Sequence, residues 1–177
     1  PAVFRVDLSR KESPSGAAEI DGVRYEAGPR GVDTAEFKLS TNPGEEVRPL
    51  VKVASGGEIS RIMLALKSVL SGADSVQILI FDEIDIGISG RIAEVVGRKL
   101  KNLSKRYQTI SITHLPQIAK MADRHFSVSK GTRRTRTVTR VRLLEPAERA
   151  PELAKLIGGA RISKLTLQHA EEMLKSS

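Results

Sequence analysis

Residues 78–83 read Ile-Leu-Ile-Phe-Asp-Glu, a short apolar run that ends in two carboxylates. An unbroken apolar run of this length is typical of a strand that is covered on both faces. A second strand of this kind is expected over residues 109–113, with a helix over residues 91–106 between the two. Strands joined by a crossover helix form parallel sheets. The sequence therefore predicts an α/β fold whose chemistry lies at the carboxyl ends of these strands.

Other kinds of element are expected on either side of this sheet. Residues 1–50 alternate apolar and polar side chains between Pro and Gly turns, which predicts an antiparallel strand arm. From Ser55 the apolar period becomes helical, with a stripe formed by Ile59, Ile62, Met63, Leu66, Val69 and Leu70. A short helix is expected over residues 116–121 and a hairpin over residues 125–130 and 135–143. Helices over 147–157 and 163–174 close the chain.

We expect residues 1–177 to form one domain with four parts. These are the strand-rich arm at 1–52, the segment with the candidate site at 53–123, a basic hairpin at 124–143 and the closing helices at 144–177. The apolar stripe of the closing helices, at Leu153, Leu156 and Ile157, could serve dimerisation or core packing. Core packing is the commoner use of such a stripe.

The composition excludes several classes of protein. The chain has 177 residues, no cysteine and three scattered histidines, which rules out disulfide frameworks, thiol nucleophiles and thiolate zinc sites. Its longest apolar run falls far short of a membrane span, so we expect no membrane partner. The lack of cysteine favours a reducing, intracellular compartment. The first residues, Pro-Ala-Val-Phe, include neither an initiator Met nor a leader, so we expect a fragment of a longer protein.

The positive charge is concentrated in one segment. The net charge is +8, and residues 130–142 hold six basic residues and no acidic one: Lys130, Arg133, Arg134, Arg136, Arg140 and Arg142. Such a run suits the phosphates of DNA, although the few aromatic residues argue against stacking on single-stranded bases. It equally suits an edge strand that charge protects against aggregation. The sequence leaves both uses of the hairpin open.

The tetrapeptide Ser55-Gly56-Gly57-Glu58 stands at a helix start. Ser55 as N-cap and Glu58 three residues later form a capping box, which contributes about 1 kcal/mol. Capping does not explain the two glycines, each of which costs up to about 1 kcal/mol in a helix relative to Ala. Glycines there allow a phosphate to approach the helix N-terminus, where free N–H groups favour an anion.

The carboxylates and a histidine are candidates for catalysis. In a phosphoryl-transfer site Asp82 would hold Mg²⁺, directly or through water, and Glu83 would polarise the attacking water. The plain alternative is a strand end that enters solvent. His114 closes the next strand, so it is expected beside the two acids in a parallel sheet. A single histidine is nevertheless more often a hydrogen-bonded structural residue.

Five stretches in this order give the chain a specific resemblance. They are Asn-Pro-Gly-Glu at 42–45, VASGGEISRIMLALK at 53–67, FDEIDIGISG at 81–90, ITHLPQIAKMAD at 112–123 and Ile-Gly-Gly at 157–159. The chain resembles the C-terminal lobe of an ATP-binding-cassette (ABC) head of the P-loop NTPase class. Within that class it is similar to the SMC-like ATPases of bacterial DNA repair. The resemblance covers most of the chain and implies parallel buried strands with crossover helices plus an antiparallel strand arm.

The resemblance also implies roles for individual residues. Ser55, Gly56, Gly57 and Glu58 match the signature motif, which contacts the γ-phosphate of ATP on the opposite protomer. Asp82 and Glu83 match the Walker B pair and His114 the switch histidine. Residues 85–90 match the D-loop, with Asp85, Gly87, Ser89 and Gly90 as the nucleotide-binding members. Two positions depart from the common pattern: Ala54 stands where many cassettes have Leu, and Ser89 where many SMC-type D-loops end in Asp.

A phosphate-cradling P-loop is missing. It needs Gly-Lys followed by Ser or Thr, and none of the fourteen glycines is followed by Lys. The resemblance therefore implies an N-terminal P-loop half, a coiled coil between the halves, and a second head in a homodimer. We expect half of a cytoplasmic, nucleoid-associated ATPase head that acts in DNA double-strand-break repair and recombination. The alternative is a non-catalytic DNA-binding or scaffolding module that retains the fold.

Overall fold

The computed structural model describes residues 2–40, 44, 46–52, 55–70, 75–133, 136–159 and 161–176. The chain divides into two compact units, Pro1–Ala54 and Ser55–Ser177. None of the helices within the described ranges has the length and apolarity needed to cross a membrane. Of the motif residues, positions 42, 43, 45, 53 and 54 lie outside these ranges.

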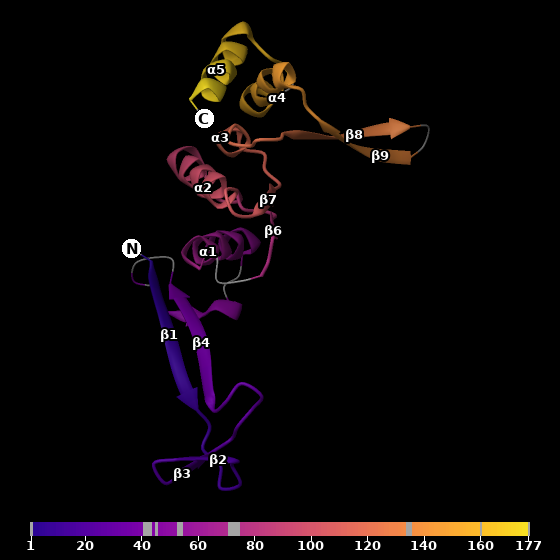
Figure 1. The fold of residues 1–177 in the computed structure, drawn as a ribbon. Helices are drawn as coiled ribbons and strands as arrows, with labels where there is room; N and C mark the ends of the chain where they lie inside the picture. Colours follow the sequence, from indigo (N-terminus) through magenta and orange to yellow (C-terminus); the bar gives the residue numbers. More distant parts are fainter. Residues whose placement is uncertain are drawn as a thin grey trace. The chain divides into compact units, whose positions relative to one another are not determined.

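The first unit is the predicted antiparallel arm. Strand β1 (Val3–Arg10) pairs with β4 (Asp33–Ser40), which also pairs with β5 (Arg48–Pro49); the 3₁₀ helix η1 (Leu50–Lys52) follows (Figure 1). The short strands β2 (Ala18–Ile20) and β3 (Val23–Tyr25) form a separate hairpin. Its turn is Asp21-Gly22, with φ of 50° and 79°. A two-residue turn with positive φ at both positions matches the twist of the strands, and Asp-Gly is a preferred pair for it.

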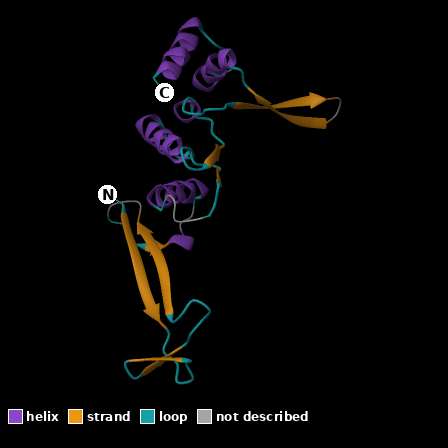
Figure 2. Cartoon of the chain, viewed as in Figure 1, coloured by secondary structure: helices purple, strands orange, loops and turns teal. Residues whose placement is uncertain are grey.

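The second unit contains the predicted parallel sheet and its helices. Helix α1 (Gly56–Val69) leads to strand β6 (Ile78–Phe81), helix α2 (Gly90–Leu103), strand β7 (Gln108–Ser111) and the short helix α3 (Pro116–Ala119). The antiparallel hairpin of β8 (Phe126–Arg133) and β9 (Arg136–Leu143) projects away from the closing helices α4 (Pro146–Gly158) and α5 (Lys164–Lys175) (Figures 1 and 2). Strands β6 and β7 run parallel, as predicted.

Two apolar clusters hold the second unit together. The larger contains Leu64 of α1, Phe81 of β6, the loop residue Ile84 and, from α2, Ala93, Val96, Leu100 and Leu103. The smaller joins α4 to α5 through Leu153, Ala154 and Ala170. Leu153 is fully buried, so this residue of the predicted α4 stripe serves core packing. Ile157 is exposed.

The prediction that β6 and β7 are covered on both faces is wrong within this chain. Leu79 and Phe81 pack into the larger cluster, whereas Ile78, Ile80, Ile110 and Ile112 are exposed, Ile80 to 68%. These four isoleucines lie on one side of the sheet, because paired residues of a parallel register and every second residue of a strand share a face. The crossover helix α2 packs with Leu79 and Phe81, on the opposite face of the sheet. In the described part of the chain the isoleucine face is therefore exposed.

Helix α1 also packs differently from its predicted stripe. Gly57 and Leu64 are its buried residues, whereas Ile59, Met63, Val69 and Leu70 of the stripe are exposed. The apolar period therefore predicted the helix correctly but the buried face wrongly. In an amphipathic helix the apolar stripe marks a face that needs a partner, and the described chain leaves most of this stripe without cover.

Candidate functional site

The parallel register brings the predicted catalytic residues together. Phe81 pairs with Ser111, and the Ile112 N–H donates to the Phe81 carbonyl at 3.0 Å. The segments 82–83 and 113–114 consequently leave the same edge of the sheet from neighbouring strands. This is the arrangement expected for Asp82, Glu83 and His114 from the carboxyl-end rule.

Asp85 forms the centre of a hydrogen-bond cluster at this edge. Its side chain is 4% exposed, and its Oδ2 lies 2.6 Å from Thr113 Oγ1, 2.7 Å from the His114 backbone N and 3.0 Å from His114 Nδ1. Burial works to raise the pKa of Asp85, but the hydrogen bonds from Thr113 and from the His114 backbone outweigh it and hold this pKa below its ordinary value. Asp85 is therefore a buried carboxylate that binds residues 113–114 of the same chain.

The loop after β6 is tied to the first turns of α1. The Ser60 hydroxyl donates to the Asp82 carbonyl at 2.7 Å, and the Arg61 guanidinium donates to the Ile86 carbonyl at 2.8 Å. Glu83 has φ of 57°, a left-handed conformation that is costly for a residue with a side chain. The Ile86 N–H closes the turn on the Glu83 carbonyl at 3.1 Å. These bonds hold the two acidic residues at the sheet edge.

The tetrapeptide at the start of α1 has the N-cap bond of the predicted capping box and an additional packing role. Ser55 accepts the Glu58 N–H at 3.1 Å, which is the N-cap bond. A Cβ at Gly56 would lie 2.3 Å from Glu83 Oε2, and a Cβ at Gly57 would lie 2.8 Å from the Glu83 carbonyl oxygen. The glycines thus permit the helix to approach the Glu83 loop, a reason for them that sequence reasoning did not find.

The acidic residues fit a magnesium ion that is shared with phosphates and water. Asp82 and Glu83 are exposed carboxylates, and one Asp82 oxygen accepts the Glu83 N–H at 2.9 Å. Within the described ranges no group of three or more His, Cys, Asp or Glu residues could hold a metal ion. Mg²⁺ is usually bound by one or two carboxylates, with waters and substrate phosphates completing its coordination. The donor set therefore matches the ion, with Asp82 as the residue that would hold it.

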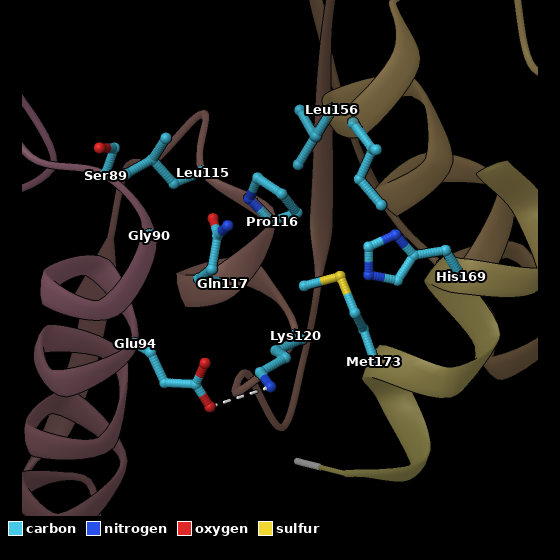
Figure 3. Close-up of a pocket in the computed structure, with 11 residues that line it drawn as sticks. Ser89, Gly90, Glu94, Leu115, Pro116, Gln117, Lys120, Leu156, His169 and Met173 are labelled. Atoms are coloured by element: carbon cyan, nitrogen blue, oxygen red, sulfur yellow. Dashed lines mark hydrogen bonds and ion pairs between the residues drawn. The ribbon is translucent and has the colours of Figure 1, made fainter.

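Two of the predicted D-loop residues, Ser89 and Gly90, lie beside a cavity. Gly87 and Gly90 have φ of 74° and 51°, so both occupy conformations that favour glycine. Ser89 and Gly90 line a cavity of about 450 Å³ that also contacts α3, α4 and α5 (Figure 3). Lys120 on its wall is 5% exposed and pairs with Glu94 at 3.3 Å, so its charge is already balanced. Glu83 and His114 are not among the lining residues.

The basic hairpin presents fewer free arginines than predicted. Arg136, Arg140 and Arg142 lie on one face of β9, as expected from their spacing. Arg142, however, forms an ion pair with Glu148 at the start of α4, in which the single nitrogen Nη1 lies 2.8 and 2.6 Å from the two carboxylate oxygens. Arg134 lies outside the described residues, and the side chain of Arg133 is not described. Arg136 and Arg140 remain exposed on the hairpin.

Comparisons with known proteins identify the relatives of the chain. No family model matches it. It is 51% identical over 144 residues to DNA repair protein RecN of Halalkalibacterium halodurans, covering 81% of this chain and 26% of that protein. It is 43% identical over 158 residues to RecN of Bacillus subtilis, covering 89% of this chain and 27% of that protein.

The chain is homologous to part of RecN. It spans about a quarter of the length of these RecN relatives, 26% and 27%. The structure is also similar to the Smc head domain, with a coiled coil and joint, of Pyrococcus yayanosii. The TM-score is 0.52 at 22% identity, over 98% of this chain and 26% of that one. This likeness concerns the fold alone: the RecN homologue has a mixed α/β fold that resembles part of an SMC head, with small parallel and antiparallel sheets.

Sequence reasoning missed three contributors to the site of this RecN homologue. Thr113 bonds Asp85, while Ser60 and Arg61 bind the loop after β6. The burial of Asp85 gave no signal in the sequence, because an acidic residue in a loop is ordinarily exposed and the neighbouring Ile86 is itself 47% exposed. Ser60 and Arg61 gave no signal, because polar residues on a helix are ordinarily exposed.

Proposed function

We propose that the chain is the C-terminal half of an SMC-like ATPase head that hydrolyses ATP in DNA double-strand-break repair and recombination. The observation that carries the proposal is the placement of Asp82, Glu83 and His114 at the carboxyl ends of two adjacent parallel strands. Phosphoryl transfer depends mainly on positioning and electrostatic stabilisation, and this edge provides a metal-binding carboxylate, a second acid and an imidazole. RecN homology supports the assignment to DNA repair.

Each site residue has a role in this proposal. Asp82 would hold Mg²⁺, which when bound neutralises negative charge on the phosphate oxygens. Glu83 accepts a hydrogen bond from the attacking water and orients it, and His114 contacts the γ-phosphate end of the substrate. Ser55, Gly56, Gly57 and Glu58 contact the ATP of the opposite head, and the D-loop residues Gly87, Ser89 and Gly90 lie at the same head-to-head surface.

The head requires a second half that carries a P-loop. The sequence lacks the Gly-Lys pair of a P-loop, so the chain has no means of cradling the β- and γ-phosphates. The bare isoleucine face of β6 and β7, formed by Ile78, Ile80, Ile110 and Ile112, is the kind of apolar surface that a partner covers. In the described residues β7 pairs only with β6, which leaves its other edge free for a further strand.

Reconstitution with a P-loop half tests this function. The chain and an N-terminal P-loop half are co-expressed, and ATP turnover is measured with Mg²⁺. We expect turnover in the combined head and a loss of at least about 100-fold in kcat for Glu83→Gln, with ATP binding retained, because the amide keeps the shape but cannot act as a base. Glu171→Gln, an exposed position on α5, is the matched control and should behave as wild type.

Two outcomes would contradict the proposal. A combined head that binds ATP without turnover would favour the non-catalytic scaffolding function. Near-normal turnover in Glu83→Gln would remove Glu83 from the catalytic role, even if the head is an ATPase.

A further inference from the structure

One oxygen of Asp85 accepts two hydrogen bonds, from Thr113 and from the His114 backbone, and lies at ion-pair distance from the His114 ring. Thr113 Oγ1, the His114 backbone N and His114 Nδ1 lie 2.6, 2.7 and 3.0 Å from Asp85 Oδ2. The Thr113 hydroxyl also accepts the Leu115 N–H at 3.1 Å, so its single hydrogen is available to Asp85. Backbone and hydroxyl contacts hold the segment 113–115 in place, and the third contact reaches the imidazole ring itself.

The contact to the ring bears on which nitrogen carries the proton. A neutral imidazole has one N–H and one lone pair, and a carboxylate oxygen 3.0 Å from Nδ1 attracts an N–H there and repels a lone pair. The contact therefore favours hydrogen on Nδ1, with the lone pair of the neutral ring on Nε2. The His114 side chain is 71% exposed, so Nε2 is open to a substrate at the sheet edge.

We propose that Asp85 is a positioning residue that fixes the Nδ1–H tautomer and the orientation of His114, so that Nε2 is the atom presented to the phosphate and the attacking water. This inference rests on the proposed function, because it assigns a reacting partner to His114. It replaces the nucleotide contact expected for Asp85 from the D-loop pattern. At 4% exposure Asp85 acts through the histidine of its own chain and offers little surface to a nucleotide on another head.

The chain offers a matched control for a purely structural role. Asp85→Asn removes the charge that favours Nδ1–H, whereas Thr113→Val removes a different donor to the same oxygen and leaves the ring contact intact. If Asp85 only held the loop together, both changes would act alike. If Asp85 sets the tautomer, only Asp85→Asn should change the ring.

Nitrogen NMR of the 177-residue chain tests the tautomer directly. Histidine is labelled with ¹⁵N, the His114 signals are assigned by their absence in His114→Gln, and spectra are recorded at about pH 8.5, above the ordinary histidine pKa. We expect the Nδ1–H pattern for His114 in wild type and in Thr113→Val, and the Nε2–H form or a mixture in Asp85→Asn. An Nε2–H pattern in wild type would overturn the inference without any variant, so the test does not depend on the folding of Asp85→Asn.

The consequence for catalysis is measured in the reconstituted head. Hydrogen-bond partners that orient metal-ligating histidines are typically worth about 10-fold to 100-fold, and we take the same range for His114. We expect Asp85→Asn to lower kcat by that factor with less than about a 2-fold change in KM for ATP, and the control Glu171→Gln to stay near wild type. Normal turnover in wild type together with an unchanged kcat in Asp85→Asn would overturn this inference and leave the proposed function standing. Absence of turnover in the wild-type head would instead contradict the proposed function on which it rests.

Discussion

Two adjacent glycines at the start of α1 approach different atoms of Glu83, and the difference predicts different costs of substitution. A Cβ at Gly56 would meet the end of the Glu83 side chain, which can rotate away. A Cβ at Gly57 would meet the Glu83 backbone carbonyl at 2.8 Å and Ile86 Cβ at 3.2 Å, neither of which can move alone. We expect Gly57→Ala to lower the free energy of unfolding by about 1–3 kcal/mol.

Gly56→Ala serves as the control for this prediction. It adds the same methyl group one residue earlier, and we expect a change in stability of less than about 1 kcal/mol because only a flexible side chain must yield. Urea unfolding of the chain followed by circular dichroism measures both variants. Equal midpoints for the two would show that the close approach of α1 to the Glu83 loop is not a constraint on the fold.

At the scale of residues, the sequence predicted which residues form the site better than it predicted the hydrogen bonds between them. Asp82, Glu83 and His114 could be placed together because the carboxyl-end rule of parallel sheets depends only on element order. The hydrogen bonds of Asp85 could not be predicted in this way. They depend on which atoms of residues 113–114 meet the loop, and that is decided by side-chain geometry at distances below 3 Å.

At the scale of elements, the hairpin of β8 and β9 was predicted with its basic residues but without the ion pair that engages Arg142. Arg136 and Arg140 remain available for the phosphates of DNA. We expect Arg136→Ala with Arg140→Ala to weaken duplex binding equally for all sequences. The slope of log affinity against log salt should flatten by up to about 0.9 for each arginine–phosphate ion pair that the substitutions remove. Fluorescence anisotropy over a range of salt concentrations measures both quantities.

Arg142→Ala is the matched control for the DNA prediction. Its guanidinium is held by Glu148, so we expect little change in the salt slope and a small decrease in the thermal midpoint from the loss of an exposed ion pair. A salt slope that also flattens in Arg142→Ala would show that the ion pair with Glu148 opens when DNA binds. An unchanged slope in the double variant would leave the hairpin as a charged edge.

Element prediction failed where the described chain leaves apolar faces exposed. The apolar period of α1 and the apolar runs of β6 and β7 were assigned to a core, because burial is what such patterns ordinarily indicate. In the structure Ile59, Met63, Ile80 and Ile112 are exposed. An apolar pattern indicates that a face is covered, but it does not indicate whether the covering residues belong to the same chain.

At the scale of the whole molecule, the open sheet edge and the lack of a P-loop in the sequence predict how the chain alone responds to ATP. Asp82, Glu83 and His114 lie on an open sheet edge and do not line the cavity beside Ser89 and Gly90. Without a P-loop, nothing in the sequence positions the phosphates on which they would act. We expect calorimetric titration of the chain with Mg-ATP to give no binding heat, and micromolar binding to appear only when the P-loop half is added. Micromolar binding by the chain alone would contradict the division of the site between two halves, because it would require a phosphate-holding element that this sequence does not contain.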